Sequence, residues 1–159
     1  FQADLSRAAV IAMYISPDVT LRLRPKLLGL APGTRVVSHQ FTLGDWEPDE
    51  SAKVENATAH LWVVPAQIAG SWIVRVAEQT YDLAIDQSYQ KLSGAAQFDR
   101  KRSPLLAGRV RGTVVRFTFL DRNGDSRTFN GRVSGATMQG VVHTAGDNRA
   151  TSRWSAIRR

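Results

Sequence analysis

Residues 8–15 form a nearly continuous apolar run, and few folds can accommodate it. About eight consecutive apolar residues suit a strand that is buried on both faces, as in a parallel sheet covered by helices. Ser16 is placed to cap a helix that begins at Pro17 and stops at Gly29, and a second strand is predicted over residues 34–41. The segment is therefore predicted to fold as strand, helix, strand, with the two strands parallel.

Such a unit needs a larger sheet around it, yet only a few residues precede the first strand. We therefore expect part of the sheet to lie before Phe1. Residues 42–50 are rich in turn formers and acids and are predicted to form a surface loop. The next two stretches, residues 53–55 and 59–65, are predicted to form an antiparallel hairpin at the edge of the same sheet.

From about residue 67 the pattern changes to short alternating stretches separated by turn signals. The stretches cover residues 71–78, 80–87, 91–99, 105–111, 114–121, 126–133, 137–143 and 151–158. Eight short strands at this spacing predict a small antiparallel barrel or sandwich. The chain is thus predicted to have two parts, an α/β segment over residues 1–66 and an all-β barrel over residues 67–159.

A weak repeat supports the barrel. The pattern apolar–x–Gly–x–Val occurs as Leu106/Gly108/Val110, Phe129/Gly131/Val133 and Met138/Gly140/Val142. Alternation places each trio on one face of a strand, and glycine on an inward face lets strands bend or approach closely. We interpret these glycines as structural, because none precedes a helical pattern as the glycines of a phosphate-binding loop do.

Two aromatic positions of the barrel carry a resemblance. Gly70 and Trp72 lie at the first barrel strand, and Trp154 and Arg158 lie on the last. This arrangement resembles lipocalin-like barrels, in which the arginine packs across the tryptophan near the closed end. The resemblance implies a lipocalin-like barrel, and an ordinary core role for Trp72 is the alternative.

The charge of the chain is uneven. Residues 1–52 hold five Lys/Arg against six Asp/Glu, whereas residues 53–159 hold sixteen against eight. A basic excess can attract nucleic acid, anionic lipid or an acidic partner, but the arginines are dispersed, which favours a solvated basic surface. No apolar run approaches the roughly 20 residues of a membrane span, so we expect a soluble protein, and its location in the cell is left open. Cysteine is absent, which removes disulfides and thiolate chemistry.

The sequence contains no complete catalytic constellation. Its histidines, His39, His60 and His143, are isolated along the chain, so no metal site is predicted. His39 stands at the predicted carboxyl end of the second strand, where open α/β sheets place ligands. His39 is therefore a candidate site residue, with a structural hydrogen-bonded role as the alternative.

Tyr14, Ser16 and Pro17 occupy the equivalent place after the first strand. Because the ends of parallel neighbours meet at one edge of the sheet, a crevice there would receive groups from both strands. Helix capping alone is an equally supported interpretation of Ser16 and Pro17. Asp45 and Trp46 either close the rim of such a pocket or form a polar loop with one packed aromatic.

The first part of the chain resembles class I S-adenosylmethionine-dependent methyltransferases. The matching strings cover residues 10–18, 21–28, 32–41, 44–49 and 61–65. In that family they belong to the fourth and fifth strands and the end of the sheet. The chain is similar, more distantly, to mitochondrial protein-lysine methyltransferases that act on membrane-embedded carriers and ATP synthase subunits.

The resemblance implies the carboxyl-terminal part of a bacterial methyltransferase, with a partial Rossmann-like segment over residues 1–66. The fold class is therefore predicted as α+β overall, the Rossmann-like segment being followed by an antiparallel barrel of about eight strands. The family's glycine-rich loop and ribose-binding acid have no counterpart here and would lie before Phe1. No cofactor-binding residue is assigned in this chain, and the chain alone is expected to be inactive and not to bind S-adenosylmethionine with useful affinity.

The implied reaction is attack by a substrate nucleophile on the sulfonium methyl group, with a protein lysine amine as one candidate acceptor. The enzyme would align and desolvate a neutral amine. Tyr14, Ser16 and Pro17 follow the strand that usually contacts the reacting group in this family, so they are expected to position the substrate, with His39 second.

Two rival hypotheses remain open. The barrel could be a binding module for a small ligand or a protein partner, although its bulky Phe117, Phe119 and Trp154 favour a filled interior. Nucleic-acid binding by the basic barrel is the least favoured. Period two puts Phe117 and Phe119 together on the expected core face, whereas base-stacking platforms must be exposed.

Overall fold

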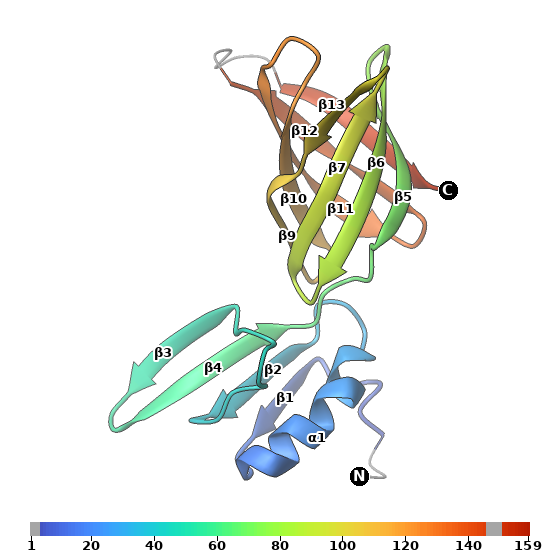
Figure 1. Cartoon of the computed structure of the whole chain (residues 1–159). Helices are drawn as coiled ribbons and strands as arrows, with labels where there is room; N and C mark the ends of the chain where they lie inside the picture. Colours follow the sequence, from blue (N-terminus) through green and yellow to red (C-terminus); the bar gives the residue numbers. More distant parts are fainter. Residues whose placement is uncertain (1–3, 146–150) are drawn as a thin grey trace. The chain divides into compact units, whose positions relative to one another are not determined.

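The computed structural model describes residues 4–145 and 151–159, which form thirteen strands and one helix (Figure 1). The chain divides into two compact units, Phe1–Ala66 and Gln67–Arg159. In the described residues, the helix is too short and too polar to cross a lipid bilayer.

The first unit is a four-stranded sheet with one helix beside it. Its strands are β1 (Val10–Met13), β2 (Arg35–His39), β3 (Glu50–Val54) and β4 (Ala57–Val63), in the spatial order β1-β2-β4-β3. Helix α1 (Pro17–Leu28) connects β1 to β2, which pair in parallel, and β4 is antiparallel to both β2 and β3. The predicted strand–helix–strand order and the predicted edge hairpin are therefore present.

The predicted α+β class, with its Rossmann-like segment, is nevertheless wrong, because the described chain is nearly all β. Only β1 and β2 are parallel, and α1 is the one helix of the described residues. A parallel sheet needs a crossover helix between each pair of strands, whereas the connections after β2 are turns and loops that produce antiparallel pairing. The run at residues 8–15 forms only a four-residue edge strand, in which Val10 is 49% exposed rather than buried on both faces.

The core of the first unit lies between α1 and the sheet. Leu27 from α1, Val36 from β2 and Trp62 from β4 are fully buried. The indole N–H of Trp62 donates to the backbone carbonyl of Trp46 at 2.7 Å, and the two indole rings lie 6.2 Å apart between centroids. Trp46 thus ties the loop after β2 into the core.

The second unit is a closed antiparallel barrel. Its ring runs β6-β5-β13-β12-β11-β10-β9-β7, and pairing of β6 with β7 closes it, so eight strands form the ring. Those strands are β5 (Gly70–Val76), β6 (Gln79–Ser88), β7 (Lys91–Phe98), β9 (Leu106–Arg111), β10 (Val114–Leu120), β11 (Ser126–Ser134), β12 (Thr137–Thr144) and β13 (Thr151–Arg158). The prediction of a barrel with about eight strands is confirmed.

One short strand was not predicted. β8 (Lys101–Pro104) pairs with β7 outside the ring and lies between two of the predicted strands, residues 91–99 and 105–111. The side chain of Ser103 is buried and its hydroxyl accepts a hydrogen bond from the backbone N–H of Leu120 at 3.0 Å. β8 therefore contacts the carboxyl end of β10 through this hydrogen bond.

Aromatic side chains fill the interior of the barrel. Phe117, Phe119 and Phe129 are fully buried, and their rings stack with centroid distances between 4.9 and 6.4 Å. The indole of Trp154 meets Phe117 and Phe129 edge-on. The predicted filled interior is confirmed, and because Phe117 and Phe119 are buried they cannot act as base-stacking platforms.

Two of the three predicted glycine trios face inward. Phe129 and Val133 flank Gly131 and are buried, as are Met138 and Val142 around Gly140. Gly131 and Gly140 are register partners, and Gly140 also pairs with Trp154, so two successive strands on one side of Trp154 lack a side chain at this level. The third trio is only half inward, because Leu106 is 45% exposed.

Two arginines of the barrel, Arg158 and Arg127, contact aromatic side chains and polar groups. The guanidinium of Arg158 lies 4.8 Å from the ring centroid of Trp72 and donates to the carbonyl of Gln67, which confirms the arrangement expected for this pair. Elsewhere, Arg127 donates to the hydroxyl of Tyr81 at 2.7 Å and forms an ion pair with Asp121. Burial raises the pKa of the Tyr81 phenol above its ordinary value, while Arg127 acts in the opposite direction.

Candidate functional site

A hollow of about 300 Å³ lies in the first unit, at the carboxyl ends of the parallel strands β1 and β2. Its lining residues are Tyr14, Ile15, Ser16, His39, Gln40 and Phe41. Three of the predicted site residues, Tyr14, Ser16 and His39, are thus brought together. They meet because the parallel register sets Met13 opposite Ser38, so the residues that follow the two strands leave the sheet at one edge.

Two aromatic rings define one wall of this hollow. The phenol of Tyr14 and the imidazole of His39 lie 4.9 Å apart between centroids, with their planes inclined by 51°. Tyr14 is 83% exposed, so its ring offers a face to a ligand at little cost in desolvation of the protein. The pair can contact both the apolar stem and the polar end of an incoming side chain.

Ser16 occupies the N-cap of α1 but does not cap it through its side chain. Its hydroxyl makes no hydrogen bond to the first turn, and only its backbone carbonyl accepts, from the N–H and the hydroxyl of Thr20. Pro17 is the first helical residue and does not line the hollow. Ser16 is therefore the more suitable of the two for contacting a ligand.

Sequence reasoning missed Ile15, Gln40 and Phe41. Gln40 has a φ of 68°, a left-handed conformation that is uncommon outside glycine, and its N–H donates to the carbonyl of Thr58 at 2.7 Å. The resulting turn at the end of β2 brings Phe41 to the hollow. Nothing in the sequence marks a positive φ at a glutamine, although Ile15 and Gln40 directly adjoin predicted site residues.

Asp45 and Trp46 do not line the hollow. Trp46 is fully buried in the core of the unit, and Asp45 forms an ion pair with Arg24 of α1. Arg24 also donates to the carbonyl of Leu43 at 3.0 Å. These contacts hold the loop after β2 against the helix, so in the described structure the two residues support the unit's packing.

The three histidines belong to three different strands. His39 ends β2, His60 bonds Ser51 across the β3–β4 hairpin at 2.8 Å, and His143 lies on β12 of the barrel. Within residues 4–145 and 151–159, no group of three or more His, Cys, Asp or Glu is placed to hold a metal ion.

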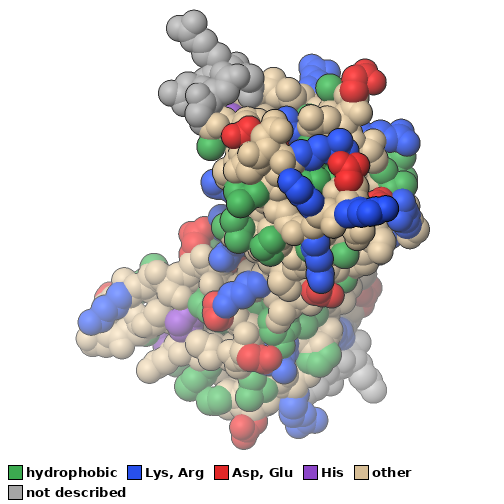
Figure 2. Space-filling view, turned by 45° about the horizontal axis from the view of Figure 1, so that its top comes forward, with side chains coloured by type: hydrophobic (Ala, Val, Ile, Leu, Met, Phe, Trp, Pro, Cys, Tyr) green, Lys and Arg blue, Asp and Glu red, His purple; other side chains and the backbone are tan. Residues whose placement is uncertain are grey.

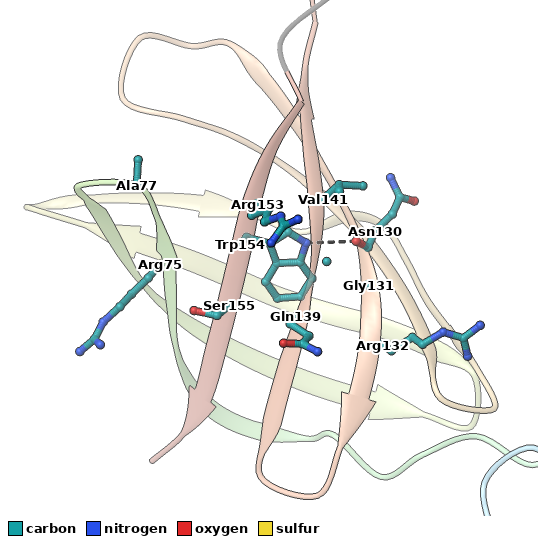
Figure 3. Close-up of a pocket in the computed structure, with 11 residues that line it drawn as sticks. Arg75, Ala77, Asn130, Gly131, Arg132, Gln139, Val141, Arg153, Trp154 and Ser155 are labelled. Atoms are coloured by element: carbon teal, nitrogen blue, oxygen red, sulfur yellow. Dashed lines mark hydrogen bonds between the residues drawn. The ribbon is translucent and has the colours of Figure 1, made fainter.

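A second and larger hollow, of about 740 Å³, lies on the outer surface of the barrel (Figure 3). Residues from β5, β11, β12 and β13 line it, with the indole of Trp154 at its base. The indole N–H donates to the backbone carbonyl of Asn130 at 3.1 Å, and Arg75 and Arg132 extend on opposite sides of it (Figure 3). Sequence analysis did not single out these arginines.

Comparison with known proteins identifies a methyltransferase among the chain's relatives. A protein-lysine N-methyltransferase of Saccharolobus islandicus (strain REY15A) is 45% identical over 69 residues, which covers 40% of this chain and 43% of the relative. Part of this chain is thus related to a methyltransferase. No protein-family model matches the chain.

Other similarities are weaker or cover little of the relative. Two 3-phosphoshikimate 1-carboxyvinyltransferases of Xylella fastidiosa, from strains 9a5c and Temecula1, are 28% identical over 96% of this chain but over only 36% of their own length. An RNA methyltransferase from Salinibacter ruber, crystallised with S-adenosyl-L-homocysteine, is 44% identical over 42% of this chain and 44% of that chain, with a TM-score of 0.41. The chain spans less than half the length of each of these relatives.

Proposed function

We propose that this chain is part of an S-adenosylmethionine-dependent methyltransferase, and that the hollow at Tyr14 and His39 positions the methyl acceptor. The observation that carries the proposal is the 45% identity over 69 residues to a protein-lysine N-methyltransferase. The matched stretch is about as long as the first unit, residues 1–66. All the sequence segments that resemble methyltransferases also lie in that unit. We therefore assign methyl transfer to the first unit rather than to the barrel.

The hollow does not fit the whole cofactor. S-adenosylmethionine carries a ribose diol and an ammonium group, both of which need hydrogen-bond acceptors. None of the six residues that line the hollow is acidic. We derive no step through the cofactor, and we assign these residues to the acceptor.

The lining side chains suit a lysine side chain that enters with its amine first. The rings of Tyr14, His39 and Phe41 provide apolar faces for the methylene stem, and the hydroxyl of Ser16 can hydrogen-bond the amine. Holding the amine in one orientation and excluding water around it favours the neutral, reactive form. A protein lysine is the acceptor named for the relative, and we propose the same acceptor class here.

The test measures methyl transfer by the complete product of the reading frame that contains this sequence. That product, a tritiated methyl donor and a protein extract are expected to give labelled methyl-lysine. Tyr14→Ala and His39→Ala should each lower the rate by about tenfold or more, because misplacement of the acceptor by even 1 Å is costly. Val54→Ala, on the exposed β3 strand, is the matched control and should keep the wild-type rate.

Two outcomes would overturn the proposal. One is the absence of methyl transfer to any protein by the complete product. The other is wild-type activity in both hollow variants. Calorimetry with the 159-residue chain provides a separate check, since micromolar binding of S-adenosylmethionine would contradict our assignment of its hollow to the acceptor alone.

The barrel as a binding module is a second candidate function. Its interior is filled by Phe117, Phe119 and Phe129, so a ligand within the barrel does not fit. The observation that favours a binding role is the hollow on the outer surface at Trp154.

A further inference from the structure

The outer surface of the barrel carries a band of cationic side chains. It is formed by exposed residues on six of the eight ring strands, and Figure 2 shows Lys and Arg side chains distributed over the visible face of the barrel. The band consists of Lys91, Arg109, Arg111, Arg116, Arg132, Arg153 and Arg75. We call these seven residues the basic band.

Strand register creates the band from residues that are scattered in the sequence. One row of laterally paired, outward positions runs Lys91, Arg109, Arg116, Asn130, Val141, Arg153. The adjacent row runs Arg111, Val114, Arg132, Gln139, Ser155, Arg75. Because neighbouring strands lie about 4.8 Å apart, consecutive cations in each row are separated by one to three strand spacings.

The hollow over Trp154 lies within these two rows. Arg75, Arg132 and Arg153 line it together with the polar Asn130, Gln139 and Ser155. None of the eleven described residues that line it is acidic. The hollow is therefore a concave, positively charged part of the basic band (Figure 3).

Three of the six acidic residues in the described part of the barrel pair with arginines outside the basic band. Asp82 pairs with Arg159 at 2.8 Å, Asp99 with Arg122 at 3.3 Å, and Asp121 with Arg127 at 3.4 Å. Residues 67–159 hold fifteen Lys/Arg against seven Asp/Glu, which leaves a net charge of +8 on this unit. The basic band therefore lies on a unit whose net charge is strongly positive.

The composition of the two rows distinguishes between classes of partner. Protein interfaces usually have an apolar or aromatic core, depleted in charge, whereas the exposed apolar members of these rows are only Val114 and Val141. Six of the seven cations are arginines, whose planar guanidinium groups bind phosphate in a bidentate manner. Repeated arginines without apolar anchors fit a partner that repeats phosphate groups.

We propose that the basic band binds the phosphate backbone of a nucleic acid, with the hollow at Arg75, Arg132 and Arg153 as its centre. Binding would be independent of base sequence, because the aromatic rings are inside the barrel and the band offers cations to phosphates alone. This proposal concerns the barrel by itself and does not depend on methyl transfer by the first unit.

The test is fluorescence anisotropy with the 159-residue chain and labelled RNA and DNA duplexes of about 20 base pairs. If three or four phosphate contacts form, raising the salt concentration from about 50 to about 200 mM should weaken binding by roughly 40-fold to 150-fold. The triple variant Arg75→Gln, Arg132→Gln, Arg153→Gln should lose at least about tenfold in affinity at low salt, and its salt dependence should fall by about two to three charges.

The control variant removes the same number of positive charges from positions outside the basic band. The variant Lys53→Gln, Arg100→Gln, Lys101→Gln changes three exposed cations outside the basic band and should bind within about threefold of wild type. Equal loss in both triple variants would overturn the proposal, since it would show an effect of net charge alone. The absence of salt-sensitive binding would also overturn it, as would stronger competition by polyglutamate than by unlabelled duplex, which would indicate an acidic protein partner.

Discussion

Trp154 occupies space that exists only because residue 131 is glycine. A Cβ atom built on Gly131 would lie 2.6 Å from Cζ2 of the indole and 2.5 Å from the carbonyl oxygen of Gln139. Both distances are below any normal contact of a Cβ atom, and the carbonyl belongs to the neighbouring strand. The indole forms the floor of the outer hollow. It can take this position only because Gly131 has no side chain.

Replacing that glycine should destabilise the barrel. Gly131→Ala is expected to cost about 1–3 kcal/mol, because the indole or the β11–β12 pairing must shift. Ser134→Ala, at an exposed position of the same strand, should stay within about 0.5 kcal/mol of wild type. Chemical denaturation followed by tryptophan fluorescence measures both, and equal stability of the two variants would contradict the assigned packing.

The stability of the barrel should fall at alkaline pH through Tyr81. Burial raises the pKa of its phenol above the ordinary value of 10.0, so the folded state favours the protonated form. This contribution is complete below the unfolded pKa and is lost as pH rises through the folded pKa. Denaturation from about pH 9 to about pH 11 should show a steeper loss for wild type than for Tyr81→Phe. Parallel loss in both proteins would show that Tyr81 is not the group responsible.

Replacing Arg24 should destabilise the first unit more than replacing Asp45, although both side chains contact the loop after β2 or each other. The Asp45 carboxylate is 72% exposed, so Asp45→Asn is expected to cost less than about 1 kcal/mol. Arg24→Gln removes the hydrogen bond to the carbonyl of Leu43 as well, and should cost roughly 1.5–3 kcal/mol. Urea denaturation of the two variants decides the matter. A larger loss of unfolding free energy for Asp45→Asn would show that the ion pair, and not the hydrogen bond to Leu43, holds the loop.

Ser16→Ala separates a capping role from a ligand-contacting one. Loss of a bonded cap typically costs about 1 kcal/mol, but Ser16 makes no side-chain bond to α1, so the unfolding free energy should change by less than about 0.5 kcal/mol. Methyl transfer by the complete gene product should fall by about two- to tenfold, as expected for one lost hydrogen bond. A destabilised variant with full activity would return Ser16 to the role of a simple cap.

Local signals in the sequence were sufficient for many of the elements. Pro17 and Gly29 correctly delimit α1. Proline fixes φ at the first turn of the helix, and Gly29 directly follows the last turn. Alternation predicted each ring strand of the barrel to within a few residues, because period two follows directly from the pleat. The hollow in the first unit was anticipated for a similar reason, since residues that follow two parallel strands meet at one edge.

Other features depend on information that no local pattern carries. An apolar run does not reveal whether its strand is central or at an edge, so Val10 was expected to be buried and is 49% exposed. The outer hollow of the barrel needs the register of four strands before Arg75 and Arg132 share one surface. Trp46 lies in a polar loop by sequence, and only the packing against Trp62 shows it to be part of the core.

The barrel's first and last strands, β5 and β13, are hydrogen-bonded neighbours in its ring. Arg158 near the end of the chain donates to the carbonyl of Gln67, so the points at which the chain enters and leaves the barrel lie together. A unit whose entrance and exit coincide can be spliced into a surface loop of another protein without stretching either flank. The proximity of its two ends thus gives the barrel the geometry that insertion into another protein requires.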